Sequence, residues 1–290
     1  MSVDVQPDTL AARQGEAGDS CPACRERLVG EYCHRCGEER FDPASLSLRR
    51  FAVKTFQELT DLEHSKIFRT LKSLLLRPGF LTNEFLAGRR SLYLSPLKVV
   101  LVTFAVSFFL YTFYRPVAVY DVRTMIENDW TGQWAKMIGE MAAEKHVTVD
   151  TFIAEVNEKW QFYMSLLQLS NVLFCAVLLQ LLYLFSRRYF VEHLVFSMHF
   201  FSFTYVVPAI LWPLYLYVGV GLTKTSAVLS AAVVAGIVFY LFLALRAVYG
   251  GSKRMTLLKA GGLYLGTYVI MSAMMLVTLV MAFVHVFITL

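Results

Sequence analysis

Long runs of apolar residues separated by short polar segments dominate the chain from residue 96 onward. An α-helix needs about 20 apolar residues to cross the roughly 30 Å hydrocarbon core of a bilayer. Five runs reach or approach that length, so the pattern predicts an all-α integral membrane protein with about five transmembrane helices in a domain of residues 96–290. The predicted spans are 96–114, 162–185, 194–220, 226–245 and 262–290.

The first connection between spans, residues 115–161, is long enough to fold on its own. Asp150 suits the N-cap position of a helix, and Phe152, Val156 and Trp160 follow at four-residue spacing, as on one helix face. We therefore predict an extracytoplasmic helical loop that packs over the transmembrane bundle. A ligand-binding loop is the alternative, but no cluster of chemically reactive side chains supports it.

Residues 41–95 show amphipathic patterns instead of continuous hydrophobic ones. Apolar residues recur at helical spacing in 48–62 and in 67–75, ahead of a break at Arg77-Pro78-Gly79. Residues 46–98 carry ten Lys or Arg against four acidic residues. Such juxtamembrane helices can lie on the anionic inner leaflet or pack against neighbouring segments, and both can hold at once.

Composition supports a membrane protein, and the charge distribution predicts its orientation. The chain is 57% hydrophobic and 17% charged, with a mean hydropathy of +0.52, which is too apolar for a soluble domain. Cytoplasmic loops are rich in Lys and Arg. The segment before the first span and the loops after spans two and four hold 21 of the 27 basic residues, so we expect a cytoplasmic N-terminus and an extracytoplasmic C-terminus. Residues 1–20 are polar and are expected to form a disordered tail.

The cysteines give the most specific chemical signal. Cys21 and Cys24 form one Cys-x-x-Cys pair, and Cys33 and Cys36 form a second pair after eight intervening residues. Four thiolates at this spacing complete the tetrahedron of a structural Zn²⁺ site, so residues 21–40 are predicted to form a small zinc ribbon. Disulfides are the alternative, although they are rare in the cytoplasm. Four sulfur ligands leave no open position for a substrate, so we expect the zinc to be structural.

Zinc ribbons often bind nucleic acids, and arginines are frequent in this one. Glutamates alternate with those arginines, however, so no patch of single sign builds up. We therefore expect a protein or lipid partner, and not a nucleic acid.

Ionisable residues cluster at the predicted inner start of the third span, namely Arg188, Glu192, His193 and His199. Such groups are costly at membrane depth and by default suggest function. Glu192 and His199 would share a helix face about 10.5 Å apart, too far for one metal ion but suited to relaying a proton or holding a phosphate. Arg188 is placed to pair with Glu192. The alternative is that Glu192 only complements the positive helix end and that His193 lies in the wet interface.

Several short motifs occur in a characteristic order along the chain. They are the cysteine quartet followed by Gly37, Thr70-Leu71 before Arg77-Pro78-Gly79, Gly88-Arg89-Arg90 with Tyr93 and Pro96, and Glu192-His193-Leu194-Val195-Phe196 with His199. Together they resemble a bacterial family of zinc-ribbon membrane proteins catalogued as domain of unknown function 3667. The resemblance implies a bacterial inner-membrane protein and brings no established activity with it.

Two functional hypotheses follow from these features. The first is a non-enzymatic inner-membrane protein whose zinc ribbon and amphipathic helices bind a cytoplasmic partner protein or lipid headgroups. The second is a transporter or intramembrane enzyme that uses Glu192, His193 and His199 for proton transfer or lipid-headgroup handling.

Overall fold

The structure is a computed structural model that describes residues 20–38, 40, 64–114, 121–218 and 224–290. The regular secondary structure of residues 64–290 is helical where the structure describes it, whereas residues 20–38 form turns with isolated β-bridges. The expected tail and the amphipathic stripe at 48–62 lie outside the described residues. The helices are α2 (His64–Leu76), α3 (Phe80–Leu86), α4 (Pro96–Tyr114), α5 (Val122–Glu127), α6 (Gln133–Glu144), α7 (Val149–Gln168), α8 (Ser170–Leu182), α9 (Phe190–Val218), α10 (Lys224–Tyr249) and α11 (Lys253–Thr289).

The apolar helices suggest membrane insertion but do not confirm all five predicted spans. In the described residues, α9, α10 and α11 are each long and apolar enough to cross a bilayer. Helices α7 and α8 together are long and apolar enough for a fourth span, although the chain bends by 44° between them. The apolar part of α4 with described side chains, Pro96–Leu110, is shorter than a full span.

Two helices have ends that differ from the predicted apolar spans. The helix expected over 162–185 is interrupted at Leu169, and α8 ends at Leu182. The last span was predicted from residue 262, and the helix that contains it begins earlier, at Lys253, where the Ser252 side chain accepts a hydrogen bond from the Met255 backbone N–H. Caps and turns set helix ends, whereas hydropathy only marks where the apolar stretch begins.

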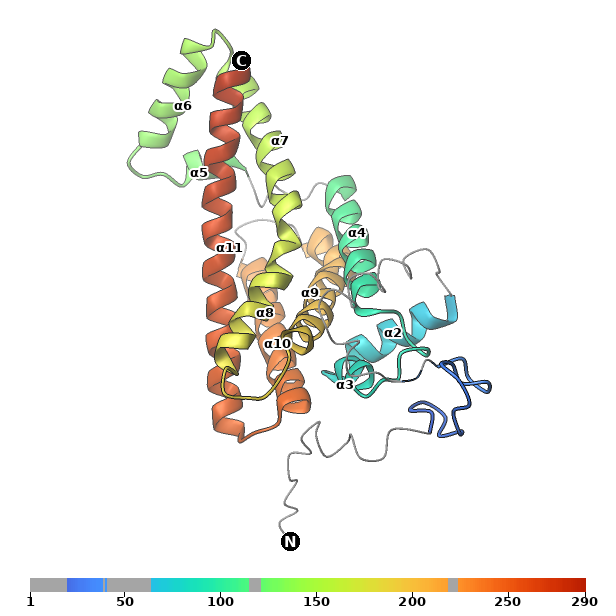
Figure 1. Cartoon of the computed structure of the whole chain (residues 1–290). Coiled ribbons are helices and arrows are strands. Elements are labelled where there is room, and N and C mark those ends of the chain that lie inside the picture. The colour runs from blue at the N-terminus through green and yellow to red at the C-terminus, as the bar shows by residue number, and fades with distance from the viewer. Residues whose placement is uncertain (1–19, 39, 41–63, 115–120, 219–223) are drawn as a thin grey trace.

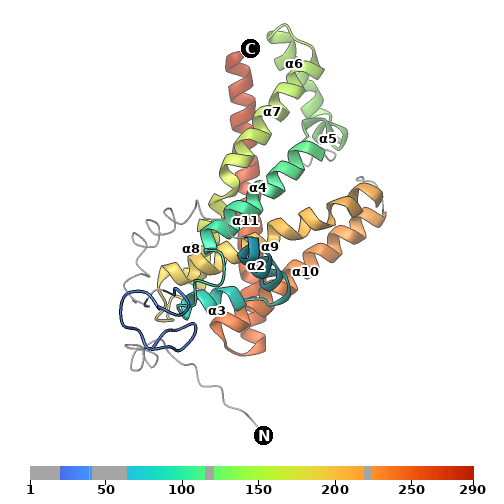
Figure 2. The same ribbon diagram turned by 90° about the vertical axis from the view of Figure 1, so that its right-hand side faces the viewer.

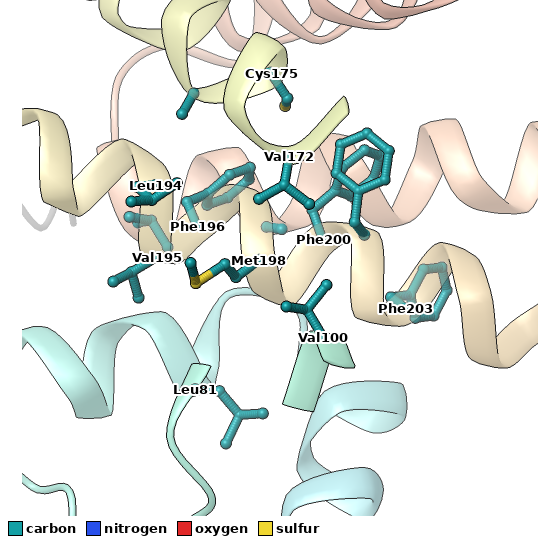
Figure 3. Packing of buried hydrophobic residues seen from close by; sticks show 14 of the residues in the cluster. Leu81, Val100, Val172, Cys175, Leu194, Val195, Phe196, Met198, Phe200 and Phe203 are labelled. Carbon is teal, nitrogen blue, oxygen red and sulfur yellow. The ribbon is translucent and has the colours of Figure 1, made fainter. Parts of the chain in front are cut away.

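The first hydrophobic core surrounds α9, which lies between α4 and α8. Its buried residues come from α2, α3, α4, α8, α9, α10 and the first part of α11. Figure 3 shows four of them, Phe196, Val172, Val100 and Leu81. Gly79 brings the turn between α2 and α3 against α10: its φ is +77°, and an added Cβ would lie 2.9 Å from the Ala244 carbonyl oxygen. Glycine is needed there for both reasons.

A second core joins α5, α6 and α7 to the C-terminal part of α11. The predicted helix face of Phe152, Val156 and Trp160 is confirmed, because all three side chains are fully buried in this core. The predicted cap was wrong, since the Thr148 side chain accepts the Thr151 backbone N–H, and Asp150 lies in the first turn of α7.

The arrangement of the helix ends fits the predicted loop pattern. The α2 and α3 helices and the α8–α9 and α10–α11 connections gather at the end of the bundle opposite the C-terminus (Figure 1). The Asn83 side-chain amide donates to the Ala247 carbonyl over 3.0 Å, which ties α3 to the end of α10. In Figure 2, α9 and α10 run side by side but are inclined away from α11.

Candidate functional site

The four N-terminal cysteines lie in two turns that repeat each other. In the first turn, the Cys21 N–H donates to the Glu26 carbonyl over 2.7 Å; in the second, the Cys33 N–H donates to the Glu38 carbonyl over 2.7 Å. Each turn closes on a left-handed residue directly after its second cysteine, Arg25 (φ 63°) in one and Gly37 (φ 72°) in the other. The module is therefore an internal duplication with a twelve-residue offset.

The two turns bring the four sulfur atoms together. All four Sγ atoms lie within 4.8 Å of one another, and Cys21–Cys36 and Cys24–Cys33 are both 3.5 Å apart. Zinc ligated tetrahedrally at about 2.3 Å places its sulfurs about 3.8 Å apart, so these positions fit such an ion. All four cysteines are free thiols here. The module can thus hold a metal ion, which when bound would supply a structural cross-link.

The thiols differ in how easily they ionise. Burial acts to raise the pKa of Cys33, but hydrogen bonds from the backbone N–H groups of Arg35 and Cys36 outweigh it and lower that pKa to about 6. Burial raises the pKa of Cys36 to about 12. A full set of four thiolates therefore requires the positive charge of a bound cation.

The module is fastened to the rest of the chain by Glu38, whose side chain is only 3% exposed. Its Oε2 atom accepts hydrogen bonds from the Arg90 N–H (3.0 Å), the Ser91 N–H (2.9 Å) and the Ser91 hydroxyl (2.7 Å). A carboxylate that accepts several backbone N–H bonds is a strong connection. Glu38 thus links the cysteine module to the loop between α3 and α4.

Three members of the predicted ionisable cluster, Glu192, His193 and His199, are buried, and Glu192 contacts the partly buried Arg188. Glu192 is fully buried, and its two oxygens accept hydrogen bonds from the Arg188 guanidinium (2.8 Å) and the Tyr189 N–H (3.1 Å). Arg188 also donates to the Val248 carbonyl over 2.8 Å. The expected Arg188–Glu192 pair is confirmed, and it ties the α9 start to the end of α10.

His193 is fully buried, which does not favour the alternative that it lies in a wet interface. Its Nδ1 lies 2.7 Å from the Tyr249 hydroxyl, and the Tyr249 ring stacks on Tyr183 at 4.2 Å between centroids. The Lys259 ammonium lies 3.6 Å from the Tyr183 ring centroid, a cation–π distance. The Nε2 atom of His193 is buried and has no hydrogen-bond partner among the described residues.

His199 lies deeper along α9 and contacts the juxtamembrane segment. Its Nδ1 is 3.0 Å from the hydroxyl of Thr82 on α3, and both residues are buried. Arg77, Gly79 and Tyr240 line a small cavity beside this pair. The stripe predicted along α9 therefore consists of separate contacts to α10 and α3.

Sequence reasoning missed Glu38, Thr82 and Tyr249. The charge pattern gave no reason to separate Glu38 from the other glutamates of the module. The twelve-residue repeat could have aligned Glu38 with Glu26. It could not have shown which of the two side chains is buried. Thr82 and Tyr249 act through contacts across 117 and 56 residues of sequence, which no local pattern encodes.

Comparison with known proteins gives a family match over one segment. Residues 64–108 match the model of a family described as "Protein of unknown function (DUF3667)". No curated protein and no solved structure matches the chain. The matched segment contains α2, α3, the Arg77-Pro78-Gly79 turn and the loop that binds Glu38, whereas the cysteine pairs and the α9 cluster lie outside it. Over residues 64–108 this chain therefore resembles the DUF3667 family, as its short motifs predicted.

Proposed function

We propose that the chain is a non-enzymatic protein of the bacterial inner membrane whose cytoplasmic face, formed by a structural zinc module and α2, binds anionic lipid headgroups. The observation that carries this proposal is the two-faced character of α2. One face is buried: the Thr70 hydroxyl accepts the Leu94 N–H over 3.0 Å, and the Leu74 carbonyl accepts the Tyr240 hydroxyl over 2.7 Å.

The other face of α2 suits a membrane surface. Phe68 and Leu76 are 72% and 70% exposed, and Arg69 and Lys72 are exposed on the same helix, which contains no acidic residue. Figure 1 shows α2 lying crosswise to α4 and α11 at the inner end of the bundle. Apolar side chains flanked by cations on a crosswise helix favour insertion at the headgroup boundary, with each cation contributing about 1 kcal/mol near an anionic surface.

Native mass spectrometry of the full-length protein released from membranes tests this proposal. We expect retained phosphatidylglycerol or cardiolipin and one zinc per chain. The double variant Arg69→Glu, Lys72→Glu should lose the anionic lipid and keep the zinc, whereas Lys136→Glu on α6 should lose neither. Equal lipid retention in all three proteins would contradict lipid binding and leave the face of α2 to a cytoplasmic protein partner.

The orientation belongs to the same proposal, and it rests on the distribution of basic residues. From residue 161 to the C-terminus Glu192 is the only acidic residue, and six of the seven basic residues lie in the α8–α9 connection or near the α10–α11 connection. Fusions of a reporter active only in the cytoplasm should be active after Gly251 and inactive after Gly132. The reverse pattern would invert the layout.

One observation favours the alternative, in which the α9 cluster moves protons. A buried polar atom without a partner costs free energy and calls for a ligand or water, and His193 Nε2 is such an atom in the described part of the chain. The remaining contacts of Glu192, His193 and His199 each tie α9 to a neighbouring segment, which supports a packing role. We therefore place this alternative second.

A further inference from the structure

The length of α11 exceeds the thickness of a bilayer. Its 37 residues span about 55 Å, against roughly 30 Å of hydrocarbon. Lys259 is the last Lys, Arg, Asp or Glu in the helix, so it marks the inner boundary of the apolar part. About 20 residues further along, a helix near the membrane normal leaves the hydrocarbon close to Leu279.

The second core begins at that same position on α11. Its α11 members are Leu279, Ala282, Phe283 and Val286, which pack against α5, α6 and α7. Thr278, one residue before, accepts a hydrogen bond from the Trp160 indole over 3.2 Å. With α11 placed across the bilayer in this way, the layer formed by α5, α6 and the first part of α7 would lie directly on the membrane surface.

Within this layer, the α5–α6 connection lies nearest to the bilayer. Both views place α5 and this connection towards the inner end of α11, whereas the α6–α7 turn lies beside the C-terminus (Figures 1 and 2). The connection carries Trp130, whose side chain is 95% exposed. A fully exposed indole at this depth is placed where tryptophan is enriched in membrane proteins.

The turn around Trp130 is built to hold its shape. The Asp129 carboxylate accepts hydrogen bonds from the Thr131 hydroxyl and N–H and from the Trp134 N–H, at 2.5, 2.9 and 2.8 Å. These bonds, that of the Thr131 hydroxyl foremost, lower the pKa of Asp129 and keep it ionised. Trp134 in turn packs on Phe283 of α11, with ring centroids 6.2 Å apart. The indole of Trp130 is thus presented from a fixed turn.

We propose that the α5–α6 connection is a membrane-docking surface, with Trp130 seated in the lipid headgroup region of the adjacent leaflet. In the predicted orientation this is the outer leaflet. The contact would fix the tilt of α11 relative to the membrane. The reason is that α5, α6 and α7, which pack on the end of α11, would then touch the bilayer at a point away from the axis of α11. The ligand is the lipid surface itself, recognised by an amphipathic ring and not by charge.

Tryptophan fluorescence of the full chain in vesicles tests the proposal. The emission that Trp130→Phe removes should be quenched by lipids brominated near the glycerol end of their acyl chains, and it should resist iodide present on both sides of the membrane. With both leaflets brominated, the result does not depend on which way the protein is inserted. Because the Trp130 side chain is exposed, the variant should fold normally.

Trp134→Phe is the matched control, because that ring packs in the second core four residues away. The emission it removes should respond weakly to both quenchers. Full iodide quenching of the Trp130 emission without any effect of brominated lipid would overturn the proposal and indicate an aqueous loop. Protection from both quenchers would also overturn it, since a protein, a second copy included, would then cover the ring.

Discussion

Glu26 and Glu38 occupy equivalent positions in the two halves of the cysteine module, yet only Glu38 is buried. The carbonyl of each accepts the N–H of the first cysteine in its own turn. The Glu26 side chain is 38% exposed and pairs with Arg35 over 3.1 Å, whereas the Glu38 side chain holds Arg90 and Ser91. A duplicated turn has thus been used once for a surface ion pair and once for attachment to the membrane domain.

Replacing Glu38 should release that attachment. Glu38→Ala leaves two partly buried N–H groups without this acceptor, at about 1–3 kcal/mol each, so amide exchange at Arg90 and Ser91 should be roughly 5- to 150-fold faster. Glu26→Ala is the matched control, since an exposed pair contributes less than about 0.5 kcal/mol. Unchanged exchange in Glu38→Ala with normal zinc content would mean that the contact is dispensable.

Removing the metal should also speed amide exchange in the loop between α3 and α4. If the module holds the proposed zinc, chelation removes the cross-link that the ion would supply, and a four-thiol module of this size is not expected to stay folded without it. Glu38 then leaves the α3–α4 loop, so the amides of Arg90 and Ser91 should exchange faster although they lie outside the module. Exchange should return to its original rate on adding zinc. Faster exchange confined to residues 21–40 would show that metal and loop are not coupled.

The left-handed residues offer a paired test of the duplication. Arg25 adopts a conformation that costs a non-glycine residue about 1 kcal/mol, while Gly37 adopts its equivalent without that cost. Arg25→Gly should therefore tighten zinc binding by roughly two- to fivefold, and Gly37→Ala should weaken it by a similar factor. Chelator competition on the full-length protein measures both. Changes in the same direction would contradict the equivalence of the two turns.

The sequence predicted the parts of this molecule that local chemistry determines. Metal-ligand spacing is encoded within sixteen residues, so Cys21 and Cys36 could be assigned to one site. The helix face of Phe152, Val156 and Trp160 could be predicted from the sequence because side chains four residues apart lie on the same face of a helix.

Features that depend on tertiary contacts could not be predicted in the same way. Hydropathy treated the last helix as one membrane span, because a residue buried against protein and one facing lipid are equally apolar. Only the packing of Phe283 against α7 and α6 shows that the end of α11 belongs to a second core. The burial of His193 could not be predicted for a similar reason, since Tyr249, which covers it, lies 56 residues away.

The remaining prediction separates the two roles of the α9 cluster. Glu192→Gln removes the charge that pairs with Arg188, whose side chain is 26% exposed, so we expect a loss of about 1–3 kcal/mol and a lower melting temperature. His199→Ala should lower the melting temperature as well, because it removes the contact with buried Thr82 and leaves a cavity. Glu140→Gln is the control for Glu192, since its pair with Lys136 is exposed on both sides.

Complementation then separates packing from proton transfer. If the cluster only packs α9, any phenotype caused by deleting the gene should be restored by each variant in proportion to its folded amount. Loss of complementation by a variant that keeps its full melting temperature would instead assign these side chains to proton transfer, and His193 Nε2 would then be the atom to follow.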